Sequence, residues 1–397
     1  MAPSLDIDAL INDPQTRIIV CCGSGGVGKT TTAAALGLRA AESGRRVVVL
    51  TIDPARRLAQ SLGLTKLDNT PSPVQGIDLA SGGTLDAMML DMKRTFDEVV
   101  EAHSTPEKAE QILANPFYQA VSSSFAGTQE YMAMEKLGQL RVEADRDRDN
   151  PRWDLIVVDT PPSRSALDFL DAPKRLGSFL DGRFIRLLAK PAKAGGRAYL
   201  KVFSAGVNIV TTTLTKVLGG QVLTDVQTFV AALDTMFGGF RERADHTYAL
   251  LKDDGTAFLV VAAPERDAMR EASYFVDRLD EEEMPLAGLV VNRVYRLSTP
   301  GLSAARALAA ADELAEEENG GRSKGSAAHS NDGTAITEGL LRLHAVQAEI
   351  AARHEAITKR FVAGNPGIPT VVVPAASADI HDLVGLREVG VSLAGGS

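Results

Sequence analysis

The feature that most constrains this sequence is a run of glycines between an apolar segment and a helical one. Residues 23–30 read GSGGVGKT, which fits the pattern G-x-x-x-x-G-K-[ST]. The apolar segment 17–22 (RIIVCC) precedes this loop, and a helix-like run from Lys29 to about Glu42 follows it. That strand–loop–helix order is the context in which such a loop binds phosphate. The alternative is a structural turn beside an unrelated lysine.

Each residue type in the loop has a physical role in holding an anion. Glycines let the backbone approach phosphate oxygens closely, and successive N–H groups face the anion together with the positive end of the following helix. Lys29 would reach the β- and γ-phosphates, and the Thr30 hydroxyl would ligate Mg²⁺. We therefore predict a site for ATP or ADP with Mg²⁺. The expected nucleotide contacts in the loop are Gly25, Gly26, Val27, Gly28, Lys29, Thr30 and Thr31.

Short apolar runs alternate with longer helical stretches along the 397 residues. Near-continuous Val, Ile and Leu in such runs is typical of parallel strands that helices cover on both faces. Seven runs meet this description: 17–22, 46–52, 85–90, 155–158, 258–262, 289–291 and 370–373. The sequence therefore predicts a single α/β domain over residues 1–397. Its sheet would be doubly wound and mostly parallel, with about seven strands, as in P-loop nucleotide triphosphatases.

Two regions are too long to be simple crossovers between strands. Residues 91–145 and 163–248 have helical periodicity and few strand signals, so we expect an inserted helical subdomain there. Residues 316–334 are polar and rich in Gly and Ser, which is typical of a flexible loop between two helices.

Two aspartates follow predicted strands, at the sheet edge where ligands bind in such folds. Asp53 would orient, or take a proton from, the water that attacks the γ-phosphate. Its alternative role is the N-cap of the next helix, with Pro54 at the first helical position. Asp159 would hold Mg²⁺ through a coordinated water, its alternative being a residue of a strand-end turn. The candidate catalytic residues are thus Asp53 and Lys29, and the candidate metal ligands are Thr30 and Asp159.

Composition excludes several other kinds of site. The two cysteines, Cys21 and Cys22, are adjacent, so a disulfide framework, a cysteine zinc site and an iron–sulfur cluster lack ligands. The net charge of −9 gives nucleic-acid binding no overall electrostatic help, and we predict no specific nucleic-acid partner.

The N-terminal residues lack a secretory pattern, and the apolar runs are shorter than the roughly 20 residues that span a bilayer. We expect a cytoplasmic protein with no transmembrane segment.

Together these motifs resemble a known family, the arsenical-pump ATPases and the ATPases that target tail-anchored proteins. It lies within the wider class of dimeric ATPases with a deviant phosphate loop. The family's loop, GKGGVGKT, is matched by residues 23–30, and its second switch, DTAPTGHT, aligns with residues 159–166. Its first switch is similar to residues 51–55 (TIDPA). Further similarity covers residues 261–265, residues 290–293 and the run that ends at Pro374.

The resemblance implies a dimer with nucleotide at its two-fold interface. By this resemblance, Asp53 positions the attacking water, and Asn292 and Pro374 contact the adenine. The helical subdomain would carry a client groove or a partner surface. The implied function is an ATP-hydrolysing switch, in a homodimer or a heterodimer with a related subunit, that acts on a protein client.

Three departures from the family pattern limit this carry-over. The family's signature lysine, which reaches the other subunit's phosphates, falls at Ser24, so the partner's transition state would lose a charge-assisted contact. Arg164 and Ser165 replace the Gly-His of the second switch, and Arg164 would act as an arginine finger or lie on the surface. The family cysteines that bind arsenite or zinc are absent, which argues against arsenite pumping of the usual form.

These departures leave two functions open. Paired with a related subunit that retains the lysine, this chain would hydrolyse ATP only in the heterodimer. The alternative is a nucleotide-binding regulatory subunit with negligible ATPase activity of its own. Residues 173–220 contain nine basic residues and one acid, a net charge of +8. This stretch would face an acidic protein or anionic lipid, or form a solvated surface.

Overall fold

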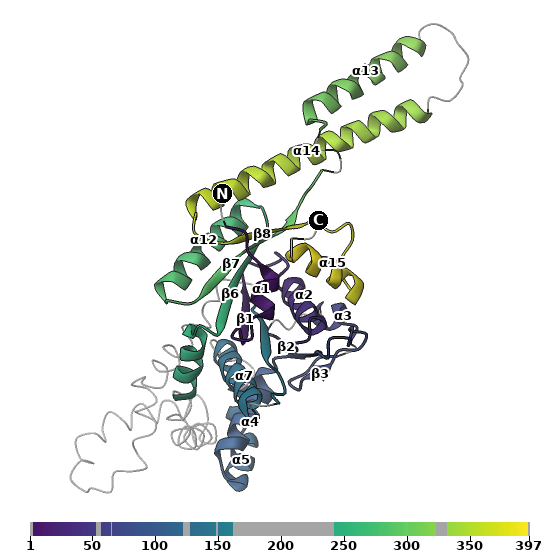
Figure 1. Cartoon of the computed structure of the whole chain (residues 1–397). Coiled ribbons are helices and arrows are strands. Elements are labelled where there is room, and N and C mark those ends of the chain that lie inside the picture. Colours follow the sequence, from purple (N-terminus) through teal and green to yellow (C-terminus); the bar gives the residue numbers. More distant parts are fainter. Residues whose placement is uncertain are drawn as a thin grey trace, which may run out of the picture.

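One eight-stranded sheet lies at the centre of the computed structural model, with helices on both faces (Figure 1). The structure describes residues 3–52, 57–64, 66–121, 128–147, 150–161, 242–297, 299, 301–322 and 332–395. The strands are β1 (Ile18–Cys22), β2 (Arg46–Thr51), β3 (Ser72–Pro73), β4 (Thr84–Met89), β5 (Leu155–Asp159), β6 (Thr256–Ala262), β7 (Leu286–Val294) and β8 (Thr370–Pro374). The helices are α1 (Ile7–Asn12), α2 (Lys29–Glu42), α3 (Arg57–Ser61), α4 (Met92–His103), α5 (Pro106–Leu113), α6 (Pro116–Val121), α7 (Thr128–Asp145), α12 (Arg266–Glu281), α13 (Ala304–Arg322), α14 (Asp332–Gly364) and α15 (Leu383–Leu393).

The strand order is β3-β4-β2-β5-β1-β6-β7-β8, and every neighbouring pair is parallel except β3 with β4. Strand β1 lies between β5 and β6. The chain first forms β2, β3 and β4 on one side, then returns to place β5 between β2 and β1, and finally adds β6, β7 and β8 in order on the other side. This arrangement confirms the predicted doubly wound α/β fold, and all seven predicted runs are strands. The eighth strand, β3, has only two residues and pairs at the edge of the sheet.

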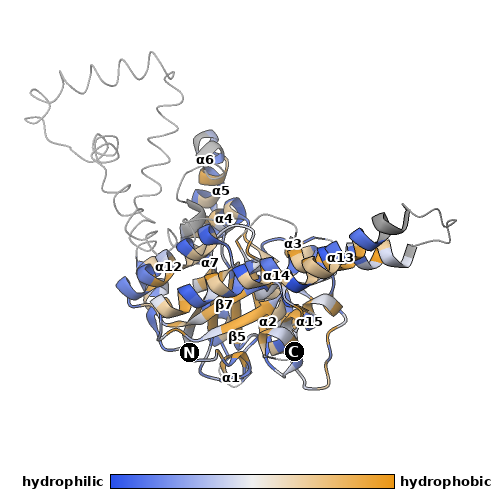
Figure 2. Cartoon of the chain, turned by 90° about the horizontal axis from the view of Figure 1, so that it is seen from above, coloured by the Kyte–Doolittle hydropathy of each residue, from blue (hydrophilic) through white to orange (hydrophobic). Residues whose placement is uncertain are grey.

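Alternate residues of the central strands enter two separate cores, one on each face of the sheet. Ile18 and Val20 pack on the face that α7 and α12 cover, whereas Ile19 and Cys21 pack on the face of α2 and α15. Because both faces are buried, the strands are continuously apolar, and Figure 2 shows them in orange beneath helices with bluer outer faces. Cys21 and Cys22 therefore lie in opposite cores, where burial raises the pKa of both thiols, to about 12 for Cys22.

The region 91–145 is helical, as predicted, and comprises α4, α5, α6 and α7. Residues 242–252, at the end of the second predicted region, are helical as well. Residues 162–241, with the basic stretch 173–220, lie outside the described residues, so the joint helical subdomain stays a prediction. Among the helices that the structure describes, none has both the length and the apolar character needed to cross a bilayer.

Helices α13 and α14 form a hairpin that extends away from the sheet (Figure 1). The small side chains of Ala307 and Ala311 are buried, and Arg342 of α14 pairs with Asp312 of α13 at 2.9 Å. The predicted flexible loop at 316–334 was wrong at both ends, because α13 continues to Arg322 and α14 begins at Asp332. Glutamates at 316–318 are good helix formers, and they continue a helix whose buried residues, Ala307 and Ala311, precede this polar stretch. Residues 323–331 lie outside the described residues.

The body of α14 is attached to the end of β7 through Tyr295 and His354. The backbone N–H of Tyr295 donates to Nδ1 of His354 over 3.3 Å, and the two rings meet edge to face with centroids 5.7 Å apart. Burial lowers the pKa of His354 and so does the nearby Arg353, while Glu265 acts in the opposite direction. His354 is thus held in the neutral form that can accept a hydrogen bond at Nδ1.

This contact is expected to weaken in acid. Since the folded-state pKa of His354 is lowered, its stabilising contribution is complete above the unfolded value of about 6.5 and is lost as the pH falls through the folded value. Hydrogen exchange of the Tyr295 amide, corrected for the intrinsic rate, should show less protection at pH 5 than at pH 7.5. The His354→Phe variant should show low protection at both values. Equal protection of the wild type at both values would contradict this assignment.

Candidate phosphate-binding site

The predicted phosphate loop connects β1 to α2 at the carboxyl ends of the parallel strands, next to the point where the sheet changes direction. Gly26 and Gly28 have φ angles of +77° and +96°, which residues with side chains rarely adopt. Gly28 is the N-cap of α2, and a glycine brings no side-chain oxygen to this position. The first N–H groups of α2 therefore face the loop without a side-chain cap.

The glycines also differ in the space around them. A Cβ on Gly23 would lie 2.1 Å from the Val261 carbonyl oxygen, and one on Gly28 would lie 2.2 Å from Nδ2 of Asn292. At Gly26, by contrast, a Cβ would meet nothing within 4 Å. The loop is thus packed tightly at its two ends and open at its middle. This is the shape that an anion held by backbone amides requires.

Lys29 lies at the start of α2 and is buried, with 5% of its surface exposed. Its ammonium group donates a hydrogen bond of 2.8 Å to the backbone oxygen of Ser24, across the loop. Ser24 is buried too. The charge of Lys29 is therefore held inside the loop, where the sequence predicted contact with phosphate.

Thr30 and Asp159 come together from two elements far apart in the sequence. The Thr30 hydroxyl donates to Oδ2 of Asp159 over 2.7 Å, and the Thr51 hydroxyl at the end of β2 donates to the same oxygen over 2.8 Å. Asp159 is fully buried. A hydroxyl and a carboxylate are hard oxygen donors of the kind Mg²⁺ prefers, so these residues fit the expected ion. The contact of Thr51 was not foreseen, although Thr51 is part of the run that matches the family's first switch.

The end of β7 reaches the loop from the other side. Asn292 donates from Nδ2 to the Val27 backbone oxygen over 2.9 Å, and Arg293 donates from Nη1 to the Gly26 backbone oxygen over 2.7 Å. Pro374, the other predicted adenine contact, ends β8, where it pairs with Val294. The structure therefore brings Asn292 to the loop itself and places Pro374 on the adjacent strand end. Arg293 has no predicted role, although it ends the segment 290–293 that is similar to the family.

Several predicted site residues lie outside the described residues. These are Asp53 with Pro54, and Arg164 with Ser165. Of the remaining predictions, Gly25, Val27 and Thr31 lie in the loop and the first turn of α2. The assignments of all these residues to water, Mg²⁺ or nucleotide stay predictions.

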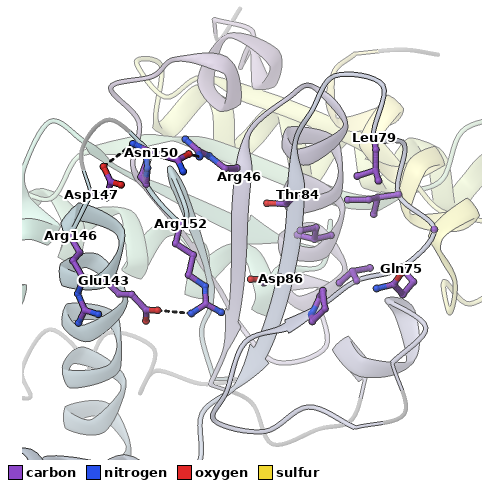
Figure 3. A pocket seen from close by; sticks show the side chains of 16 residues that line it. Arg46, Gln75, Leu79, Thr84, Asp86, Glu143, Arg146, Asp147, Asn150 and Arg152 are labelled. Carbon is purple, nitrogen blue, oxygen red and sulfur yellow. Dashed lines mark hydrogen bonds and ion pairs between the residues drawn. The ribbon is translucent and has the colours of Figure 1, made fainter.

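A hollow lies at the amino ends of the parallel strands, opposite the phosphate loop, where β2 and β4 begin. It has a volume of 690 Å³, and its wall includes Arg46, Asp86 and Arg152 (Figure 3). Arg152 pairs with Glu143 at 2.6 Å, and Asp86 accepts a hydrogen bond from the indole of Trp153 at 2.9 Å. Arg152 and Asp86 thus each have a partner within this hollow or beside it, and no residue of the phosphate loop lines it.

Comparison with known proteins places this arrangement in a family. Residues 16–301 match the anion-transporting ATPase (ArsA) family. ATPase BagA of Mycobacterium tuberculosis is 28% identical over 170 residues, which is 42% of this chain and 48% of BagA. ATPase GET3C of Arabidopsis thaliana is 25% identical over 296 residues, 72% of this chain and 68% of GET3C. The ATPase ASNA1 homolog 2 of Paramecium tetraurelia is 24% identical over 289 residues, 72% of this chain and 78% of the relative.

The match to BagA spans about half of that relative's length, whereas the matches to GET3C and the ASNA1 homolog cover about two thirds or more. The family match covers well over half of the chain and includes the phosphate loop, β2, β5, β6 and β7. It confirms the resemblance drawn from the motifs. On this basis, the chain belongs to the anion-transporting ATPase family, together with GET3 and ASNA1 ATPases.

Proposed function

We propose that this protein is a Mg²⁺-dependent ATP hydrolase that acts as a dimeric switch on a protein client. The observation that carries the proposal is the Thr30–Asp159 contact of 2.7 Å beside the buried ammonium group of Lys29. It supplies two oxygen donors and one positive charge at the end of the phosphate loop where α2 begins. Family membership and the ATPase relatives support the same conclusion.

The reaction would be an in-line attack of water on the γ-phosphorus, in which the bond to the β–γ bridging oxygen breaks and ADP leaves. Little covalent chemistry is required of the protein, so catalysis consists of positioning and electrostatic stabilisation. Lys29 would stabilise the charge on the β- and γ-phosphates, and Asp53 would orient the water. Thr30 and Asp159 would hold Mg²⁺, which when bound neutralises charge on the phosphate oxygens.

Exchanging the carboxylate of Asp159 tests the metal part of this proposal. The Asp159→Asn variant should lose at least about tenfold in Mg²⁺-dependent phosphate release, because the amide lacks the charge that holds the cation. Binding of Mg²⁺-free ADP should change much less. Asp254→Asn, an exposed exchange before β6, serves as the control. Equal Mg²⁺ dependence in all three proteins would contradict a metal role for Asp159.

The partner is proposed to be a related ATPase subunit that retains the family's lysine. Ser24 provides no charge to send across a dimer interface, and it lies buried beside Lys29. A heterodimer would let this chain's nucleotide receive the missing lysine from the partner. Purification from the native host should therefore yield a mixed dimer whose turnover exceeds that of this chain alone. A strictly homodimeric preparation with full turnover would contradict the heterodimer.

Ser24 also favours one alternative, a regulatory subunit that binds ATP but hydrolyses it negligibly. Phosphate release by the wild type, in its purified dimer, separates the two functions when compared with Asp53→Asn. A rate that falls in the variant supports the hydrolase. Equal background rates in both proteins support the regulatory subunit.

The client surface is proposed to lie on a helical subdomain built from residues 91–145 and 163–248. Its basic stretch 173–220 would attract an acidic partner. A cytoplasmic location is part of the same proposal.

A further inference from the structure

The end of β7 has an unusual backbone at Arg293. Its φ angle is +61°, in the left-handed region that is costly for a residue with a Cβ. The pairing of β7 with β8 is interrupted at the same place, because Val291 pairs with Val372 and the next pair is Val294 with Pro374. One extra residue on β7 thus forms a bulge, a device that redirects a side chain at a strand end.

The bulge directs two neighbouring side chains at two neighbouring carbonyl groups of the phosphate loop. Arg293 donates to the Gly26 oxygen at 2.7 Å, and Asn292 donates to the Val27 oxygen at 2.9 Å. The backbone N–H of Arg293 in turn donates to Oδ1 of Asn292 at 2.9 Å, which fixes the orientation of the Asn292 amide group. We call these three hydrogen bonds the β7 clasp.

Peptide geometry gives the clasp a consequence for the amides of the loop. In a planar trans peptide, the carbonyl oxygen and the N–H of the next residue point in opposite directions. Holding the Gly26 and Val27 oxygens toward β7 therefore turns the N–H groups of Val27 and Gly28 away from it. These two amides belong to the set that the loop motif offers to phosphate oxygens.

Lys29 restrains a third carbonyl group of the same loop, that of Ser24.

The strained backbone at Arg293 has a reason in this contact. Strained backbone persists where the surrounding structure maintains it, and such sites are often functional. The Arg293 side chain is exposed and contributes little to either core. The left-handed backbone at this residue thus serves the contact with the loop and not the packing of the fold.

We propose that Arg293 is a positioning residue of the phosphate loop, which orients the Val27 and Gly28 amides toward the phosphate tail of a nucleotide. This inference rests on the proposed function for its ligand, although the clasp itself is independent of any ligand. Arg293 acts through the backbone of the loop and is not assigned a contact with the nucleotide.

Two variants separate the guanidinium group from the backbone conformation. Arg293→Asn and Arg293→Gly both tolerate a positive φ but cannot reach Gly26. Each should raise the Kd for ATP and ADP about tenfold, as expected for the loss of a hydrogen bond from a charged donor. Without nucleotide, the thermal stability of the Arg293→Gly variant should equal or exceed that of the wild type. Arg293→Lys, which keeps the charge, should recover part of the affinity.

Hydrogen exchange provides a readout that does not depend on nucleotide. Without ligand, the Val27 and Gly28 amides should exchange faster in Arg293→Asn than in the wild type. Arg296→Asn, an exchange of a nearby exposed arginine, should leave both amide exchange and nucleotide affinity unchanged.

The proposal is overturned if Arg293→Asn keeps wild-type amide exchange and affinity, or if Arg296→Asn causes the same losses. A wild-type protein that binds no nucleotide would instead contradict the proposed function. In that case, faster amide exchange in Arg293→Asn would still support the positioning role.

Discussion

Replacing Lys29 by alanine is expected to lower ATP hydrolysis by about a thousandfold, the effect of losing a preorganised charge at the transferred phosphoryl group. The Lys29 ammonium is buried and is held across the loop by the Ser24 oxygen, so its position is fixed before nucleotide arrives. No conformational change is then needed to bring the charge to the phosphates. Steady-state phosphate release with Mg²⁺, by the purified protein, measures the loss.

The control for Lys29→Ala is Lys252→Ala, which removes a lysine near the opposite edge of the sheet, at the end of the helical residues 242–252. Its turnover should equal that of the wild type. Urea unfolding without nucleotide shows whether Lys29→Ala has kept its fold. Retention of more than about a tenth of wild-type turnover in a folded Lys29→Ala protein would contradict the assignment of Lys29 to the phosphates.

Gly23→Ala is expected to destabilise the protein by about 4 kcal/mol, because the new Cβ would lie 2.1 Å from the Val261 oxygen. That oxygen belongs to the backbone of β6, a central strand, and cannot move without disturbing the sheet. Gly26→Ala is the matched exchange in the same loop. Its φ is also positive, but a Cβ would meet nothing within 4 Å, so only the backbone cost of about 1–2 kcal/mol applies.

Urea denaturation of both glycine variants, in the absence of nucleotide, gives the two free energies of unfolding. The difference between them measures how tightly the loop packs against β6. Equal destabilisation would show that Gly23 is required only for its backbone conformation. An unfolded Gly23→Ala protein beside a folded Gly26→Ala protein would agree with the expected order.

Much of the fold was predictable, because burial on both sheet faces leaves a local signature in the sequence. Runs such as IIVCC (18–22) and LIVV (155–158) are continuously apolar since their alternate residues enter different cores. Thr30 and Asp159 were both predicted as ligands of one Mg²⁺, and their side chains are joined by a hydrogen bond of 2.7 Å, although their role toward the metal stays a prediction. These predictions needed only residue type and chain order.

Features set by contacts between distant segments were not predictable in this way. Strand β3 has two residues, one of them Pro73, and forms only because β4 offers an edge. Nothing in the composition of Arg293 indicates a positive φ, since that angle arises from the broken register between β7 and β8. The helical extent of 316–322 was not predictable from the polar, Gly-containing composition of this stretch, because the helix begins far upstream at Ala304 and continues into it.

Tyr295 is attached to His354, and it lies two residues beyond Arg293, which contacts the phosphate loop. This attachment is the point about which the hairpin would tilt as a rigid body. Asp332, at the far end of α14, precedes His354 by 22 residues, which corresponds to a rod of about 33 Å. A tilt of α14 by about 10° at His354 would therefore move its Asp332 end by about 6 Å. Small movements of the end of β7 beside the phosphate loop would thus become larger displacements at the Asp332 end of α14. A spectroscopic label at that end would detect them.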